Sequence, residues 1–202
     1  MIGTVAVDRP EVILARHGET EWSRSGRHTG RADPPLTELG AKQAGLLAPR
    51  LAGRRFAAVF SSPLSRATET CRLAGWGKEA QVREELLEWG YGEYEGLTTA
   101  EIRAVRPGWL LWRDGCPGGE DARSVGGRAD RMIDELRGLD GDAALFAHGH
   151  LLRAIAARWV GLPPESGALL ALSTASLSVL GYEREVAVVR CWNDTSHLGE
   201  QV

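Results

Sequence analysis

The sequence predicts a single α/β domain, built as a three-layer α/β/α sandwich around a mostly parallel sheet. Short apolar runs alternate along the chain with longer stretches of helical spacing, which is the pattern of strand–helix–strand units. The length of 202 residues suits one domain with a substantial core. The composition, 43% hydrophobic and 25% charged, is that of an ordinary globular chain, so we expect one domain over 1–202.

The first part of the chain alternates strand and helix twice. The runs EVILAR and FAAVFSS are short and apolar, which is typical of buried strands. Apolar residues from Leu39 to Leu51 recur at helical spacing after Thr37, a good N-cap, and Pro63 can open a second helix. The expected elements are, in order, a loose lead-in at 1–10, a strand at 11–16, a helix at 36–53, a strand at 56–62 and a helix at 64–75.

The middle of the chain breaks this rhythm. A short strand is expected near Val82, and the run 97–107 predicts a short helix that Pro107 stops. The run 109–121 is rich in glycine, proline and tryptophan, which favours a loop or flap. We therefore expect the segment of about 85–123 to form a small cap insertion over one end of the sheet.

The last part returns to alternating elements. The run DAALFAHGH predicts a buried strand, and the amphipathic runs on either side of it predict helices, the first with Ser124 as its N-cap. Two apolar runs near the C-terminus read as closing strands. The expected elements are a helix at 124–139, a strand at 142–150, a helix at 151–162, and strands within 168–183 and 185–192.

Charge and cysteine content exclude several classes of partner. The formal net charge is −3, whereas nucleic-acid and membrane-surface binders usually carry a basic excess, so we expect neither partner. The three cysteines lie far apart, and a sparse, odd set fits a reducing cytoplasm better than a disulfide framework. We see no signal peptide and no run near the roughly 20 apolar residues of a membrane span. A cytoplasmic location is expected, and a homodimer or a higher homo-oligomer stays open.

Reactive side chains follow the predicted core strands. Arg16 and His17 end the first strand, His148 ends the strand of 142–150, and Arg66 comes one helical turn after the strand of 56–62. Ligands of open α/β sheets bind beyond the carboxyl ends of the strands. We therefore expect these four side chains to converge at one end of the sheet.

Two arginines and two histidines suit phosphoryl transfer. A guanidinium presents a planar fork of donors to phosphate oxygens, and nearby arginines disfavour protonation of an imidazole. A neutral histidine is a nucleophile, so His17 or His148 could attack phosphorus and form a phosphohistidine. The second histidine would then stabilise the equatorial oxygens, and no metal or other cofactor is required.

The reaction also needs a proton donor for the leaving oxygen. The run ELLEWGYGEYEG offers four carboxyl groups, of which Glu88 lies between leucines and a tryptophan, where one carboxyl could be partly desolvated. The residues themselves prefer Glu88 only weakly. The alternatives are Glu85, Glu93 and Glu95.

Several separated motifs resemble, in the same order, those of the histidine phosphatase superfamily, which includes the cofactor-dependent phosphoglycerate mutases. The motifs are ARHGETEW at 15–22, GRHTGRADPPLTELGAKQA at 26–44, FSSPLSRATETC at 60–71, LLEWGYGEYEGLT at 86–98 and FAHGHLLRA at 146–154. Together with WLLWRDGCPGGE at 109–120, they are most similar to actinobacterial acid phosphatases and to fungal sedoheptulose bisphosphatase. The resemblance covers almost the whole chain and implies a phosphoglycerate mutase-like fold.

The resemblance also assigns roles to residues. It implies that His17 is the phosphorylated nucleophile, that Arg16, Arg66 and His148 complete the phosphate pocket, and that Glu88 is the proton donor. It further implies that four residues line the phosphate site, namely Ser23, Thr29, Gly30 and Gly149. The implied enzyme is a metal-independent phosphoric monoester hydrolase (EC 3.1.3.-) of the histidine acid phosphatase type, acting on a sugar phosphate or another small phosphate monoester.

Other interpretations stay open. A phosphoglycerate mutase is the first alternative, although Ser23 stands where mutases typically have asparagine, and a non-catalytic phospho-ligand-binding relative is the second. The pair His148 and His150 could bind a metal, but no second acidic cluster accompanies it. His28 and His150 are expected to orient other groups or to lie at the rim, and Cys116 is expected to pack. The tryptophans Trp89, Trp109 and Trp112 could form core or line the substrate side.

Overall fold

The computed structural model describes residues 9–201, so most of the predicted lead-in lies outside the described residues. Six strands form one sheet in the order β3-β2-β4-β1-β5-β6. Their bounds are β1 Val12–Arg16, β2 Ala58–Ser61, β3 Ala80–Val82, β4 Ala143–Ala147, β5 Leu177–Glu183 and β6 Val186–Asp194. Every predicted strand is therefore confirmed, with β4 ending three residues earlier than expected.

The sheet is parallel over its first four positions and antiparallel at one edge. β1 pairs with β4, β4 with β2, and β2 with β3, all parallel. β5 runs antiparallel to β1, and β6 antiparallel to β5. This arrangement confirms the predicted mostly parallel sheet, and it leaves the carboxyl ends of β1, β2 and β4 at the same end of the molecule.

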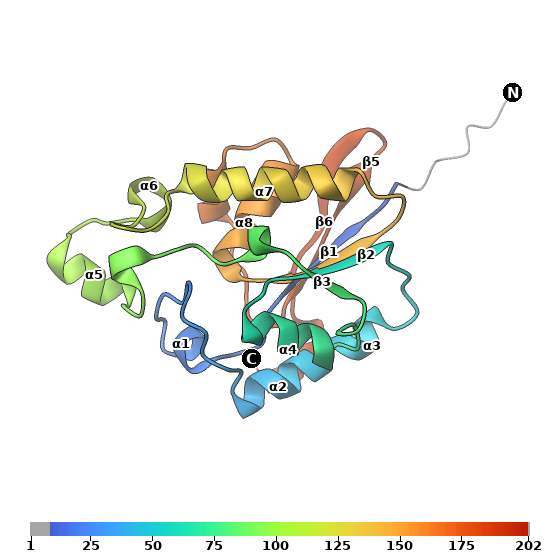
Figure 1. Ribbon diagram of the computed structural model, residues 1–202, viewed down its shortest axis with the longest axis horizontal. Coiled ribbons are helices and arrows are strands. Elements are labelled where there is room, and N and C mark those ends of the chain that lie inside the picture. Colours follow the sequence, from blue (N-terminus) through green and yellow to red (C-terminus); the bar gives the residue numbers. More distant parts are fainter. Residues whose placement is uncertain (1–8, 202) are drawn as a thin grey trace, which may run out of the picture.

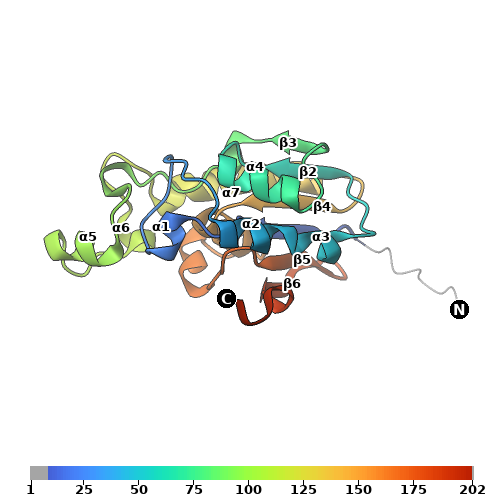
Figure 2. The same ribbon diagram turned by 90° about the horizontal axis from the view of Figure 1, so that it is seen from below.

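Helices cover both faces of the sheet because the central strands are apolar on both sides. In β1, Val12 and Leu14 join the core cluster under α7 and α8, whereas Ile13 and Ala15 join the cluster on the opposite face. Figure 1 shows α7 and α8 above the sheet and α2, α3 and α4 below it. Figure 2 shows the second group lying across the near face, with β3 and β6 at opposite edges. The fold is the predicted three-layer sandwich.

The long helices agree with the sequence in place and differ in bounds. They are α2 Glu38–Gly45, α3 Leu47–Leu51, α4 Ser65–Leu73, α7 Ala122–Arg137 and α8 Gly149–Trp159. The short helix α1 Glu21–Arg24 was not predicted. Two six-residue 3₁₀ segments, at Pro164–Leu169 and Ser196–Gln201, complete the C-terminal part, and the second is kinked at Gly199. None of the helices described is long and apolar enough to cross a bilayer.

The prediction of a single helix over 36–53 is wrong in one respect, because the chain forms two helices there. Thr37 caps α2 as predicted, its hydroxyl accepting the Gly40 N–H at 3.0 Å. Pro49 has no N–H to donate to the carbonyl of Gly45, and its ring would clash with that carbonyl in a continuous helix. The chain therefore breaks at Leu46 and starts α3 afresh.

Two helices, α7 and α8, begin earlier than predicted. The N-cap of α7 is Asp121 and not Ser124, because the Asp121 carboxylate accepts the Ser124 N–H at 2.8 Å. Asp and Ser are equally good N-caps, so the sequence did not separate them. α8 begins at Gly149, directly after His148 in extended backbone, so the predicted strand end at 150 belongs to the helix.

The segment between β3 and α7 contains no strand. It holds 3₁₀ turns at Glu84–Leu86 and Gly92–Tyr94, then α5 Thr99–Val105 and α6 Leu111–Asp114. α6 was expected to be loop, and α5 confirms the predicted short helix. Figure 1 shows α5 and α6 beyond the end of the sheet, on the side where α1 lies.

Candidate active site

The register of β1 and β4 brings the two predicted histidines together. Arg16 pairs with Ala147, so His17 and His148 follow at adjacent positions on neighbouring strands. The His17 N–H donates to the Ala147 carbonyl at 3.0 Å. The two imidazole rings lie 5.2 Å apart between centroids. The sheet therefore supplies the convergence that the sequence predicted.

A close backbone approach fixes the loop after β1. A Cβ added to Gly18 would lie 2.2 Å from the Gly40 carbonyl oxygen at the start of α2, so only glycine fits there. The Gly18 N–H donates to the Thr70 hydroxyl of α4 at 3.1 Å. The segment that carries His17 is thus held from both α2 and α4.

Hydrogen bonding selects the tautomer of His17. Its Nδ1 lies 2.7 Å from the Gly18 carbonyl oxygen, which can only accept, so Nδ1 carries the proton. Burial, and then Arg16 and Arg66, hold the pKa of His17 well below its usual value, so the ring is neutral at pH 7. Nε2 consequently keeps a lone pair, and no group in the described part of the chain binds it. This is the state of a nucleophilic histidine.

Arg16 has donor capacity to spare. One Nη1–H donates to the Leu172 carbonyl at 2.5 Å, whereas the buried Nε has no hydrogen-bond partner among the described residues. A Cβ on Gly149 would lie 3.4 Å from the guanidinium carbon, so this glycine lets the guanidinium rest against the first turn of α8. Unpaired buried donors are costly, and an anion at this point would satisfy them.

Arg66 is fully buried and its donors are occupied. Nε donates to His148, and the two Nη groups donate to acceptors on the loop that leads into α2. These acceptors are the carbonyl oxygens of Thr29, Gly30 and Ala32 and the carboxylate of Asp33. In this structure Arg66 holds that loop and the His148 ring in place and adds positive charge behind the site.

His148 is likewise held on both ring nitrogens. Nδ1 accepts the Arg66 Nε–H at 3.2 Å, so in the neutral ring Nε2 donates to the Ser62 hydroxyl at 2.8 Å. Burial and then Arg66 lower the pKa of His148 well below its usual value. The ring is therefore neutral and hydrogen-bonded on both sides in this structure.

Glu88 is anchored at the N-terminus of α8. Its Oε1 accepts the N–H groups of Trp89 at 2.9 Å and Leu151 at 3.0 Å, and its Oε2 accepts the His150 N–H at 3.0 Å. Oε1 therefore uses both lone pairs, and Oε2 keeps one position open. Glu88 is the only one of the four candidate glutamates that lines the cavity with His17.

A cavity of about 190 Å³ collects these groups. Arg16, His17 and Glu88 line it, together with Ser23, Thr29 and Gly149 from the predicted set. Arg66, His148 and Gly30 lie behind its wall, and the Gly30 N–H donates to Glu95 at 2.7 Å. A wider hollow of about 840 Å³ beside α1 and α2 includes neither histidine of the strand ends, so the smaller cavity is the candidate site.

The hydroxyls of Ser23 and Thr29 already have local partners. Ser23 forms a reciprocal capping box with Thr20 at the start of α1. The Thr29 hydroxyl donates to the Arg27 carbonyl at 3.1 Å. Both residues therefore shape the wall of the cavity and also have a structural use.

Sequence reasoning missed part of this wall. Tyr91, Arg27 and Arg153 line the cavity, and His28 and His150, expected at the rim, line it too. The Tyr91 hydroxyl lies 2.7 Å from Nδ1 of His150, and burial lowers the pKa of His28 to about 4. Spacing in the sequence could have indicated two of these residues. Tyr91 follows Glu88 by three residues, and Arg153 lies one helical turn after Gly149.

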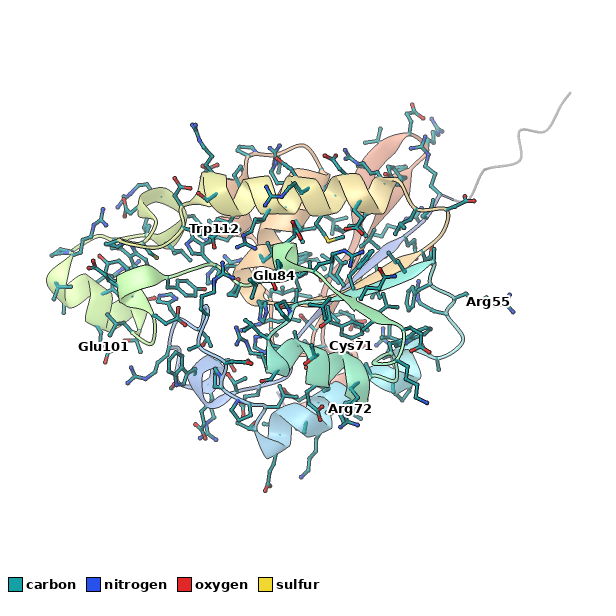
Figure 3. The ribbon with its side chains drawn as sticks, viewed as in Figure 1. Arg55, Cys71, Arg72, Glu84, Glu101 and Trp112 are labelled. Carbon is teal, nitrogen blue, oxygen red and sulfur yellow. The ribbon has the colours of Figure 1, made fainter. Side chains whose placement is uncertain are left out.

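The remaining candidate residues, three tryptophans and a cysteine, lie outside the lining of the cavity. Trp89 and Trp109 are buried in the core cluster, and Trp112, labelled in Figure 3 near the start of α7, packs against it. Burial raises the pKa of the Cys116 thiol to about 12, which leaves it unreactive at neutral pH. Within residues 9–201 no three His, Cys, Asp or Glu side chains gather as metal ligands.

Comparisons with known proteins agree with the motifs. The sequence model of the histidine phosphatase superfamily (branch 1) matches residues 12–195. The chain is 40% identical over 197 residues to an acid phosphatase of Mycobacterium tuberculosis, covering 96% of this chain and 97% of that protein. It is 37% identical over 185 residues to sedoheptulose 1,7-bisphosphatase of Saccharomyces cerevisiae, covering 76% of this chain and 68% of that protein.

The fold has a matching structural neighbour. The solved structure of an open reading frame of M. tuberculosis superimposes with a TM-score of 0.86 at 40% identity. The match covers 91% of this chain and 97% of that chain. The predicted resemblance in sequence and the predicted fold class are both confirmed, and the relatives' names support a phosphatase activity.

Proposed function

The chain belongs to branch 1 of the histidine phosphatase superfamily, and from that membership we propose that it hydrolyses phosphate monoesters through a phosphohistidine on His17. The observation that carries the proposal is the shared cavity. It holds the free Nε2 of neutral His17, the unpaired donor of Arg16 and the anchored carboxyl group of Glu88. The proposed enzyme requires no metal and no other cofactor.

In the first step His17 Nε2 attacks phosphorus and the bond to the leaving oxygen breaks. The leaving oxygen takes a proton from Oε2 of Glu88, the oxygen that keeps a position open. Oε1 then serves as the carbonyl oxygen and keeps its two N–H donors. The Nδ1–H bond to the Gly18 carbonyl stabilises the positive charge that the ring acquires.

In the second step water attacks the phosphohistidine. The Glu88 carboxylate takes one proton from that water, the P–N bond breaks, and His17 regains its lone pair as inorganic phosphate leaves. Arg16, whose side chain lines the cavity, holds phosphoryl oxygens throughout with its guanidinium. Arg66 is fixed by its neighbours, so we assign it to charge stabilisation from behind the site. We assign His148 a hydrogen bond to a phosphoryl oxygen, which its Nε2–H makes by leaving the Ser62 hydroxyl.

We propose a small sugar phosphate as substrate. Support comes from the size of the cavity, about 190 Å³, which admits a phosphate and a short carbon chain. Further support comes from the relative whose name is sedoheptulose 1,7-bisphosphatase.

The test uses p-nitrophenyl phosphate with and without EDTA, and acid or alkaline quench of ³²P-labelled enzyme. We expect turnover that EDTA leaves unchanged, and a phosphoenzyme that is labile in acid and stable in base. His17→Ala should abolish both signals because the nucleophile is lost. Near-normal turnover in His17→Ala would overturn the mechanism. Transfer of the label to an added sugar acid, with no release of free phosphate, would indicate a mutase.

A further inference from the structure

The cavity has more arginines than the proposed reaction uses. Three arginines line it, Arg16, Arg27 and Arg153, against the single carboxylate of Glu88. That carboxylate accepts three backbone N–H groups and forms no ion pair with an arginine among the described residues, although its charge attracts both Arg16 and Arg153. Arg27 contacts Glu101 at 3.5 Å, but Glu101 is half exposed and lies on α5 at the outer edge of the molecule (Figure 3). Exposed pairs of this kind contribute little.

Arg153 is the cation for which the proposed reaction has no use. Its Nε donates to the Gly167 carbonyl at 2.9 Å and its Nη2 to the Ala168 carbonyl at 3.3 Å. Its guanidinium carbon lies 5.2 Å from the centre of the Trp112 ring. Within the described part of the chain Nη1 has no acceptor and no carboxylate forms an ion pair with the side chain. The guanidinium is thus held rigidly in the wall with one donor unused.

The position of Arg153 on α8 sets its separation from Arg16, which binds the reacting phosphate. A Cβ on Gly149, at the first turn of α8, would lie 3.4 Å from the guanidinium carbon of Arg16, and Arg153 lies four residues further along the same face. Four residues correspond to about 6 Å along a helix axis. Arg16 also lowers the pKa of Arg153, after the larger effect of burial and against the opposing effect of Glu88, so the two cations repel one another.

Apart from Glu88 and the arginines, the polar side chains that line the cavity are uncharged. The Tyr91 hydroxyl and Nδ1 of His150 bind one another at 2.7 Å. Burial keeps the imidazoles of His28 and His150 neutral, since it lowers the pKa of each. Such a surface suits hydroxyl groups or a short carbon chain and does not itself attract a second anion.

We propose that the substrate carries a second anionic group, a phosphate or a carboxylate, which Arg153 binds one helical turn from the reacting phosphate with Arg27 at the rim. This inference rests on the proposed function and adds its substrate class. The enzyme therefore acts on small metabolites with two anionic groups, such as bisphosphates or phosphorylated acids. Arg153 selects them through its unused Nη1 donor.

The test compares three series of synthetic substrates, each with chain lengths from three to six carbons. These are the alkyl phosphates, the α,ω-diol bisphosphates and the ω-carboxyalkyl phosphates. At the best length we expect kcat/KM for at least one series with a second anionic group to exceed that of the alkyl phosphate by about 10–100-fold, the range for one charged hydrogen bond. A factor of two for the bisphosphates is statistical, because either end can react. The second group is a phosphate if the bisphosphates have the larger kcat/KM, and a carboxylate if the carboxyalkyl phosphates do.

Variants locate the preference. Arg153→Gln should bring the ratio of kcat/KM for substrates with a second anionic group to kcat/KM for alkyl phosphates towards one. Arg153→Lys should restore part of that ratio because the charge returns. Arg158→Gln is the matched control, since Arg158 lies on the same helix but pairs with Asp130 at 2.7 Å outside the cavity. It should keep the wild-type ratio.

The outcomes separate the two proposals. A wild-type ratio near one for every length, or an unchanged ratio in Arg153→Gln, overturns the anion subsite while hydrolysis itself stands. The absence of any turnover that depends on His17 overturns the proposed function instead. If Arg153→Gln fails to fold, the wild-type ratio and the Arg153→Lys ratio still decide.

Discussion

At the scale of single residues, backbone groups determine what the reactive side chains can do. The Gly18 carbonyl fixes the tautomer of His17, and three N–H groups fix both oxygens of Glu88. Neither side chain has to reorganise before the reaction, which is the condition for electrostatic preorganisation.

Glu88→Gln tests this arrangement directly. The amide cannot donate and recover a proton in the two steps, so we expect kcat to fall about 10²–10⁴-fold. The amide NH₂ would also meet the His150 N–H that Oε2 now accepts, which leaves a buried donor unpaired. We therefore expect the free energy of unfolding to fall by about 1–3 kcal/mol, measured by urea denaturation alongside steady-state kinetics.

The matched control is Glu85→Gln. The Glu85 carboxyl group is one-third exposed and contacts only Arg131, at 3.6 Å, so both quantities should stay near wild type. If Glu88→Gln kept kcat within a few-fold of wild type, another group would have to supply the proton.

At the scale of elements, helix starts were the least predictable feature. The chain offers Asp121 and Ser124 three residues apart, and both are good N-caps. Tertiary packing decides between them. Ala122 and Val125 are both buried in the core, so the first turn of α7 has to include residue 122. The same limit applies to 36–53, where the apolar spacing continues through Pro49 although the backbone cannot.

Asp121→Ala should destabilise the molecule more than Ser124→Ala. Asp121 accepts both the N–H and the hydroxyl of Ser124, at 2.8 and 2.7 Å, whereas Ser124 accepts nothing in return. Loss of an N-cap costs about 0.5–2 kcal/mol, and loss of one exposed hydroxyl costs less. Thermal and urea unfolding of the two variants measure the difference. Equal effects, or a larger effect of Ser124→Ala, would contradict the assigned cap.

At the scale of the whole molecule, the sequence predicted the sheet and the nucleophile better than the rest of the pocket. Strand ends are local in sequence, so Arg16, His17 and His148 could be placed at one edge before the register was known. The fixed hydrogen bonds of Arg66 and the lining by Tyr91 and Arg153 depend on loop and helix packing. No local pattern encodes these contacts, because each partner lies on a different element.

Collecting four neutral histidines at one end of the sheet should make the folded state sensitive to acid. Burial is the main cause that lowers the pKa of His17, His28, His148 and His150. The unfolded chain takes up these protons near the ordinary pKa of about 6.5, whereas the folded chain does not, so the unfolded state binds more protons. Stability is therefore fully present above that pKa and falls as the pH decreases below it.

Urea unfolding at pH 7, 6 and 5 measures this loss, which we expect to approach about 1.4 kcal/mol per pH unit for each histidine below pH 6. Carboxylates with lowered pKa, such as Asp194 with a pKa of about 2, contribute only near and below pH 4, so this window reports on histidines. His28→Phe keeps the aromatic contacts with Tyr91 and Trp109 and removes one titrating group, so its slope should be shallower by one such increment. For His28 the loss should end near pH 4, where the folded-state ring also protonates. A free energy of unfolding that stays constant from pH 7 to pH 5 would show that the folded chain accepts these protons, and the neutral state of His17 would then have to be abandoned.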